Sequence, residues 1–250
     1  MSTHLMITRR PAWTALALAS CVLASPGVGA ADFSVSPIRA ELGPSSPSET
    51  ITVTNHSPGR LRVSVKLMAW TQDAEGKDVY TDSSDLIYFP RQMDIDKESR
   101  KIVRVGAKSP PDRVERAYRL FIEEMPDPLD LPGRPSVNFV FRFGVPIFVP
   151  PPDGKPSLDV QAPTLAKGKV VLPVRNDSNA HVRLTKINVS DGAGLSIDAN
   201  GWYSLAGTQR TYTVDIPPEA CRKARSLLVT AEGPAAKFER RLDVDPANCS

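Results

Sequence analysis

One strand-like run near the middle of the chain, residues 137–149, constrains the fold more than any other segment. It reads VNFVFRFGVPIFV, and every odd-numbered position in it is apolar. Because successive side chains of a strand point to opposite faces, this spacing predicts a strand with one continuous apolar face. Pro146 has no amide hydrogen for a sheet ladder, which indicates an edge strand or a strand end.

Two interpretations of this apolar face are open from the pattern alone. The face could belong to the core of the chain's own sandwich, which is the usual cause of such alternation. It could instead fill a groove on another chain, because a long apolar edge strand is an aggregation hazard unless it pairs with a partner. Alternation does not distinguish the two cases, since both need the same apolar side chains on one face.

The N-terminus is expected to be a signal peptide, residues 1–30. Arg9 and Arg10 precede an apolar run over 12–24 that is too short to span a membrane, and Val28-Gly29-Ala30 offers a cleavage site. Two alternatives remain open, a twin-arginine signal at Arg9-Arg10 and a lipidation site at Cys21. No later segment is apolar enough to cross a bilayer, so we expect an exported protein without stable membrane insertion.

Two cysteines, Cys221 and Cys249, remain after this cleavage. In an oxidising compartment an isolated pair predicts a disulfide. Neither the cysteines nor the scattered histidines have the spacing of metal ligands, so we expect no metal and no cofactor. With only His56 and His181 in the mature chain, no catalytic set is visible, and we expect no enzyme. The net charge of +3 comes without a basic run, which argues against nucleic acid.

The remaining pattern is all-β. Short alternating segments are separated by turn residues, no amphipathic helix of twelve or more residues is evident, and 24 prolines suit loops and edges. Pro150-Pro151-Pro152-Asp153-Gly154 is the best linker candidate. We therefore expect a first domain over 31–150, a linker over 151–154 and a second domain over 155–250. The expected strands lie at 51–54, 61–69, 102–105, 118–122, 169–175, 182–189, 210–216, 226–231 and 238–244.

In its order of segments the mature chain resembles the periplasmic pilus-assembly chaperones of the chaperone–usher pathway. The segments that carry the resemblance are FSVSPIRAEL (33–42), VTNH (53–56), AW (69–70), LIYFPR (86–91), KIVRV (101–105), YRLFIEEMP (118–126) and GVPIFV (144–149). The resemblance implies two immunoglobulin-like β-sandwich domains in an angled, L-shaped arrangement, located in the periplasm. It also implies two partners, a pilus or surface-fibre subunit and an outer-membrane usher.

In this family the chaperone lends a strand to an incomplete subunit, a mechanism called donor-strand complementation. The resemblance places that donor at Val137, Phe139, Phe141 and Phe143, with Ile147 and Val149 in the chain's own core. One alternating strand can supply backbone hydrogen bonds to an open edge and side chains to a groove.

Two cations of the family bind the subunit's terminal carboxylate. Arg39 matches the arginine of the first strand, whereas the lysine position falls on or near Pro146 and carries no charge. Arg142 and Arg119 are the nearest replacements in the sequence. A different class of function, an exported adhesive or carbohydrate-binding β-sandwich, would need an exposed aromatic platform, for which Trp202 and Tyr203 are the candidates.

Overall fold

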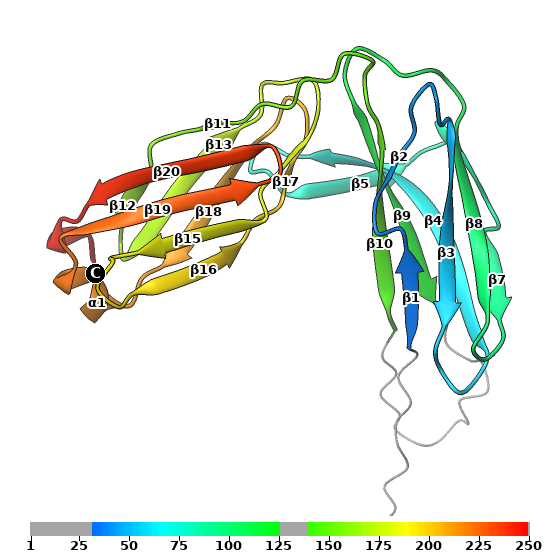
Figure 1. Cartoon of the computed structure of the whole chain (residues 1–250), viewed down its shortest axis with the longest axis horizontal. Helices are drawn as coiled ribbons and strands as arrows, with labels where there is room; N and C mark the ends of the chain where they lie inside the picture. The colour runs from blue at the N-terminus through cyan, green and yellow to red at the C-terminus, as the bar shows by residue number, and fades with distance from the viewer. Residues whose placement is uncertain (1–31, 126–139, 250) are drawn as a thin grey trace, which may run out of the picture.

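The computed structural model describes residues 32–125 and 140–249, so the expected signal peptide lies outside it. Figure 1 shows two β-sandwich domains set at an angle to each other. One hydrophobic core gathers residues from Phe33 to Val149, and another gathers residues from Leu165 to Cys249. The prediction of two angled β domains is therefore confirmed. No described strand lies between Val149 and Asp159, the stretch that contains the expected linker.

The first domain packs two sheets face to face. One has the strand order β1-β3-β8-β6, and the other has the order β2-β10-β9-β4-β5, with β7 pairing to β4. The bounds are β1 (Phe33–Ser36), β2 (Ala40–Glu41), β3 (Ser48–Asn55), β4 (Leu61–Gln72), β5 (Asp78–Asp82), β6 (Leu86–Phe89), β7 (Gln92–Ile95), β8 (Arg100–Ala107), β9 (Arg116–Glu124) and β10 (Arg142–Val149).

The second domain has one sheet in which β13 pairs with β11, β12 and β18, another of order β16-β15-β19-β20, and a short pair of β14 and β17. The elements are β11 (Asp159–Val160), β12 (Thr164–Ala166), β13 (Lys169–Arg175), β14 (Val182–Arg183), β15 (Lys186–Ser190), β16 (Ser196–Asn200), β17 (Tyr203–Ser204), β18 (Gln209–Asp215), α1 (Pro218–Lys223), β19 (Ser226–Gly233), β20 (Ala236–Asp243) and the 3-10 helix η1 (Pro246–Cys249).

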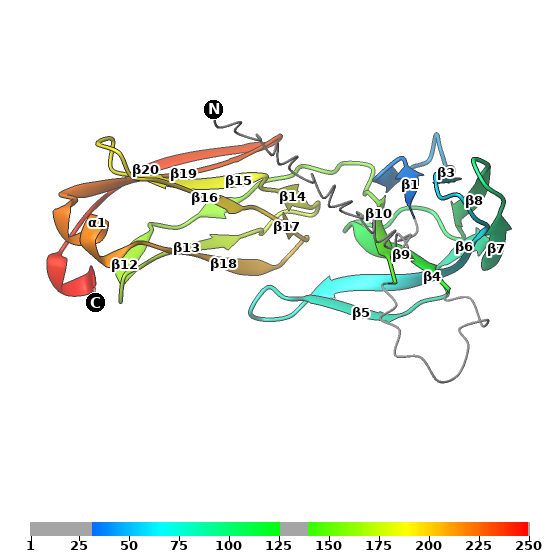
Figure 2. The ribbon, with the colours of Figure 1, turned by 90° about the horizontal axis from the view of Figure 1, so that it is seen from below.

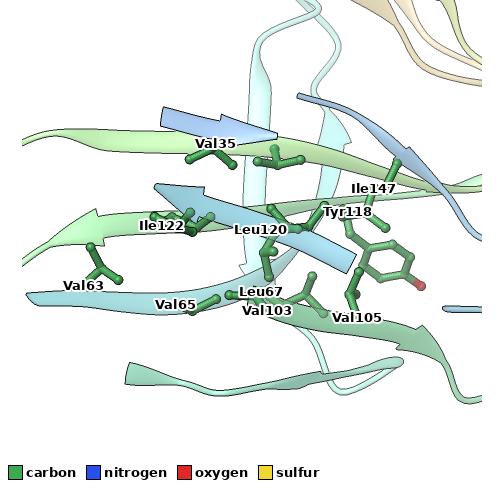
Figure 3. Packing of buried hydrophobic residues seen from close by; sticks show 14 of the residues in the cluster. Val35, Val63, Val65, Leu67, Val103, Val105, Tyr118, Leu120, Ile122 and Ile147 are labelled. Carbon is green, nitrogen blue, oxygen red and sulfur yellow. The ribbon is translucent and has the colours of Figure 1, made fainter. Parts of the chain in front are cut away.

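Alternation places the first core where the sequence predicts it. The inward residues of β4, β8 and β9 interdigitate between the sheets, and Figure 3 shows Val63, Val65 and Leu67 of β4 pointing the same way. The first segment of the domain forms two short strands in different sheets. β1 pairs antiparallel with β3 in one sheet, and β2 pairs parallel with β10 in the other. The first-strand segment thus changes sheets between Ser36 and Ala40.

The expected strand over 182–189 is divided in the structure. β14 pairs with β17, but β15 pairs with β16 and β19 in a different sheet. The burial pattern changes phase in between, since Val182 and Leu184 are buried and the next buried residue is Ile187. A strand cannot keep one register while its apolar side changes phase, so the segment breaks.

Cys221 and Cys249 form a disulfide, with Cα atoms 5.6 Å apart. It ties α1 to η1, and both sulfur-bearing residues are buried in the core of the second domain. A loop closed across 28 residues lowers the entropy of the unfolded chain by an amount worth roughly 3–4 kcal/mol of stability.

Domain packing relies on apolar residues on the outer face of the first domain's larger sheet. Trp70 of β4 and Phe148 of β10 point away from the first core, yet they are 2% and 0% exposed. They form a separate cluster with Tyr203 and Leu205 of the second domain. The two domains thus share a small hydrophobic core of their own.

The hairpin of β4 and β5 extends beyond this shared core to reach the second domain, as Figure 2 shows. Gln72 donates from Nε2 to the carbonyl of Tyr203, and its Oε1 accepts from the backbone amide of Leu205 and the hydroxyl of Thr208 at 2.8–3.0 Å. Asp78 accepts from the indole of Trp202 at 2.8 Å. One amide side chain and one carboxylate therefore connect the hairpin to β17 and to the residues on either side of it, between 202 and 208.

Gly76 lies at the turn of this hairpin, with a φ of +78°. A Cβ atom there would lie 2.5 Å from the carbonyl oxygen of Gln209 and 2.8 Å from the Cα of Arg210. Both atoms belong to the backbone of β18, so they cannot move aside without moving the strand. The absence of a side chain at Gly76 allows the two domains to approach this closely.

We expect Gly76→Ala to weaken the packing between the domains. Gly192→Ala is the matched control, because Gly192 has a φ of +71° and no heavy atom within 4 Å of the added Cβ. Both variants carry the cost of roughly 1–2 kcal/mol for a left-handed Ala, but only Gly76→Ala pushes the hairpin off β18. Thermal melting should show the larger drop for Gly76→Ala, together with a change in Trp202 fluorescence. Equal drops and unchanged fluorescence would contradict the prediction.

Candidate functional site

The apolar face of β10 is exposed at the start of the strand and buried in the core at its end. Val145, Ile147 and Val149 are buried in the first core, which confirms the prediction that Ile147 and Val149 pack within the chain. On the same face, Phe143 and Phe141 are each 40% exposed. The ring of Phe143 meets the ring of Phe33 edge-on, with centroids 4.9 Å apart. The apolar stripe therefore continues past the point where the domain covers it.

Half of β10 has an open backbone edge within the described chain. β9 pairs with all of β10, from Arg142 to Val149, along one side. On the other side β2 pairs only with Ile147 and Phe148. β1 lies beside the lower part of β10 in Figure 1, but its pairing is with β3. Arg142 to Pro146 thus have a strand neighbour on one side only among the residues described.

Four residues were expected to form the donor strand, and the structure describes two of them. Phe141 and Phe143 lie as stated above. Val137 and Phe139 fall outside the described residues.

Arg39 lies at the point where the open edge of β10 ends. It precedes β2, whose first residue, Ala40, pairs with Ile147. Arg39 lines a groove of about 370 Å³ between the domains. Its Nη2 lies 2.8 Å from an Oε1 of Glu41, and both side chains are about half exposed. An exposed pair of this kind contributes little to stability, so the guanidinium is available for another carboxylate.

Arg142 lies far from Arg39. It is five residues before Ile147, which corresponds to roughly 16–17 Å along a strand. Its Nε lies 3.2 Å from Glu123, and its guanidinium lies 3.8 Å from the centroid of the Phe121 ring. Arg142 and Arg39 therefore do not meet at one carboxylate in this structure.

Arg119 is buried in the interface between the domains. It is 6% exposed, and its Cζ lies 4.0 Å from the ring of Trp70 and 5.5 Å from that of Trp202. Nη1 donates to the carbonyl of Gly144 at 2.9 Å, and a Cβ at Gly144 would come within 3.2 Å of Arg119 Cδ. Aromatic faces hold the guanidinium by cation–π attraction, so Arg119 acts as part of the interface and not of the groove.

Tyr80 of β5 lies on the same outer face of the larger sheet, and the charge of Arg119 affects its pKa. Burial raises the pKa of Tyr80, the neighbouring Asp78 adds to the increase, and Arg119 opposes it. The Tyr80 ring packs edge-on against Phe121, with centroids 5.2 Å apart. The outer face of the sheet thus carries alternating aromatic and cationic groups next to the second domain.

The structure adds three groove residues that sequence reasoning missed, Glu115, His181 and Arg183. An Oε1 of Glu115 accepts from the backbone amide of His181 at 2.9 Å and lies 2.8 Å from its Nδ1. The His181 ring stacks on Phe148 with centroids 3.7 Å apart. Arg183 lies with its Cζ 5.2 Å from the ring of Tyr203. No local pattern identifies these residues, because packing between distant segments brings them together.

A second cavity of about 420 Å³ lies between the domains and includes Gln72, Asp85, Arg116 and Tyr118 in its lining. Its cation is already engaged, since Arg116 donates to the hydroxyl of Ser109 and the carbonyl of Pro110. Burial, with a hydrogen bond to Asp85, raises the pKa of Tyr118 to about 12, so this phenol stays neutral. The cavity offers no unengaged cation.

The described part of the chain offers neither a metal site nor a membrane-spanning helix. No group of three or more His, Cys, Asp or Glu residues is placed to hold a metal ion. No helix in residues 32–125 or 140–249 is long and apolar enough to cross a membrane.

Residues 32–155 match the family model described as the pili and flagellar-assembly chaperone, PapD N-terminal domain. A search of the curated proteins found no match. Among solved structures, the CsuC–CsuE chaperone–tip adhesion subunit complex of Acinetobacter baumannii is similar with a TM-score of 0.60 at 19% identity, covering 84% of this chain and 97% of the matched chain.

Two other solved structures are similar over the same extent. The chaperone DraB of E. coli matches with a TM-score of 0.54 at 19% identity, covering 84% of this chain and 98% of that one. The SafA pilin–SafB chaperone complex of Salmonella enterica matches with a TM-score of 0.53 at 13% identity, covering 84% and 96%. At these identities the likeness concerns the fold, which spans both domains. With the family match over its first domain, the chain is a divergent member of the PapD-like periplasmic pilus-assembly chaperones of the chaperone–usher pathway.

Proposed function

We propose that this protein captures an incomplete fibre subunit in the periplasm by donor-strand complementation and delivers it to an outer-membrane usher. One observation carries the proposal: the open edge of β10 coincides with the exposed end of its apolar face. A subunit that lacks a strand exposes both an unpaired edge and a hydrophobic groove. The first part of β10 and the residue before it complement both defects, because the backbone of Arg142 to Pro146 can pair while Phe141 and Phe143 fill the groove.

Arg39 provides the anchor for such a subunit. A strand added to the open edge must stop where β2 begins, at Ala40. If it runs parallel to β10, its C-terminus arrives at Arg39. An antiparallel strand would instead bring its N-terminal end to a guanidinium. Charge therefore favours the parallel direction, with the terminal carboxylate bound by Arg39 in a charge-assisted hydrogen bond.

The choice of partner follows from the family and from two of the structural neighbours. The CsuC–CsuE structure is described as a chaperone–tip adhesion subunit pre-assembly complex, and the SafA–SafB structure as a pilin with its chaperone. We infer a partner of the same kind for this chain, a pilus or surface-fibre subunit. The usher follows from the pathway to which the family belongs.

The adhesive or carbohydrate-binding alternative gains no support from the aromatic candidates. Tyr203 is 4% exposed in the cluster between the domains. Trp202 is 37% exposed, but its indole donates to Asp78 and its edge packs on Tyr203. Neither ring presents a free face of the kind that stacks on a sugar.

Phe141→Ala should leave the free protein nearly as stable as the wild type but weaken subunit capture. Ile147→Ala is the control in the same apolar row, and it should cost about 2–5 kcal/mol of stability because Ile147 is fully buried. The subunit would first be identified by co-purification with the tagged protein from its native periplasm. Thermal melting and capture of that purified subunit are then compared for both variants.

The two readouts separate the donor role from a core role. A donor residue loses apolar contact only in the complex, so Phe141→Ala should bind at least tenfold more weakly per folded molecule. A large drop in melting temperature for Phe141→Ala, with capture per folded molecule unchanged, would show that the residue is ordinary core.

Arg39→Gln should also fold normally and lose subunit binding. A hydrogen bond to a charged group is worth about 1.5–3 kcal/mol, which corresponds to a loss of about tenfold or more. Arg62→Gln serves as the control, since Arg62 of β4 is a similarly exposed arginine of the same domain with its own carboxylate partner, Asp94, and lies outside the open edge of β10. Equal affinities of wild type and Arg39→Gln would reject the anchor.

A further inference from the structure

We propose that Arg183 of the second domain is the second cation that binds the subunit's terminal carboxylate, together with Arg39 of the first domain. This inference rests on the proposed function, because it concerns the same carboxylate. It adds a residue that lies outside the strands from which the anchor was expected. The observation behind it is that Arg39 and Arg183 line one groove.

The charges of this groove leave one guanidinium without a carboxylate. Glu41 is paired with Arg39, and Glu115 is engaged by the backbone amide and the ring of His181. Arg183 makes no ion pair with any residue in the described ranges, and its guanidinium contacts only the Tyr203 ring among the aromatic groups there. The groove is therefore suited to one additional anion.

Two sets of contacts position β14 and its Arg183, one with the first domain and one within the second domain. Two residues earlier, His181 is fixed to the first domain by its stack on Phe148 and its contacts with Glu115. Arg183 itself lies in β14, whose pairing with β17 sets it opposite Tyr203. Its side chain is exposed, so a ligand can reach it. A pre-positioned guanidinium loses little freedom on binding, and its planar fork suits a carboxylate.

The direction of the added strand brings a carboxylate to this groove. β2 takes over the edge of β10 at Ile147, so a parallel guest strand ends beside Arg39. The sheet continues from there toward Pro150 and Pro151, which also line the groove. The guest's last oxygen atoms thus arrive between the first domain's Arg39 and the second domain's β14.

Neither of the cations expected from the sequence competes for this role. Arg142 lies at the opposite end of the open edge, and Arg119 lies under Trp70 and Trp202. A carboxylate held by Arg39 and Arg183 would connect the two domains directly. Capture would then depend on how the two domains are oriented. An anchor formed by Arg39 alone would not depend on that orientation.

The test compares Arg183→Gln with Arg240→Gln. Arg240 is a matched control, because it is an exposed arginine of the second domain whose Cζ also lies 5.2 Å from an aromatic ring, that of Phe238, and it does not line the groove. The probe is the purified subunit in two forms, one with its natural C-terminal carboxylate and one with a C-terminal amide made by intein chemistry. Affinity is measured at low and at physiological salt.

We expect Arg183→Gln to bind the carboxylate form about tenfold more weakly and Arg240→Gln to bind it as the wild type does. For the amide form, Arg183→Gln and wild type should bind equally, since the charge that Arg183 contacts is gone. Arg183→Lys should retain part of the affinity, and a melting curve like that of the wild type would exclude a folding defect.

The outcomes distinguish this inference from the proposed function. If Arg39→Gln loses affinity for the carboxylate form but Arg183→Gln does not, the inference is overturned and the Arg39 anchor stands. If Arg183→Gln weakens both subunit forms equally, Arg183 contacts another part of the subunit and the inference is also overturned. If wild type binds neither form, the proposed function itself fails.

Discussion

The packing of the second domain on Trp70 and Phe148 is the contact on which the arrangement of the two domains depends. Both residues point outward from the larger sheet of the first domain, and without Tyr203 and Leu205 they would be an exposed aromatic patch. Burying aromatic side chains of this size is worth several kcal/mol in total. The hydrogen bonds of Gln72 and Asp78 then orient this contact, because each needs a particular partner, Tyr203 for Gln72 and Trp202 for Asp78. The angle between the domains in Figure 1 follows from these contacts.

The same contact creates the groove in which the proposed anchor lies. His181 is placed by its stack on Phe148, and β14 then carries Arg183 to the groove that Arg39 also lines. Arg119 does not reach this groove. Its guanidinium packs on the ring of Trp70, and the aromatic cluster shields it from solvent. The three arginines expected to bind the carboxylate therefore lie in different places. Arg119 lies in the interface, Arg142 in a surface ion pair, and Arg39 in the groove between the domains.

β10 serves two purposes along its length. Its second half completes the core of the first domain between β9 and β2. Its first half leaves an open edge, and Phe143 in this half and Phe141 just before it are each 40% exposed. Under the proposed function, stability and capture would be assigned to successive residues of one face. A long apolar edge is normally a liability for a protein. Here the open stretch ends where β2 begins, and in the proposed complex this would limit the length of edge that a guest strand can pair with.

The sequence by itself determined the class of fold and the strand that matters most. Alternation is a local property, so the pattern of residues 137–149 was enough to predict the apolar face of β10 and the burial of Ile147 and Val149. The cysteine pair could be predicted from its number and compartment. Only the tertiary structure decided the division of the 182–189 segment, the burial of Arg119 and the presence of Arg183 and Arg39 in one groove. These features depend on contacts between residues that are far apart in the chain, and a side chain's exposure is decided by whatever segment comes to cover it.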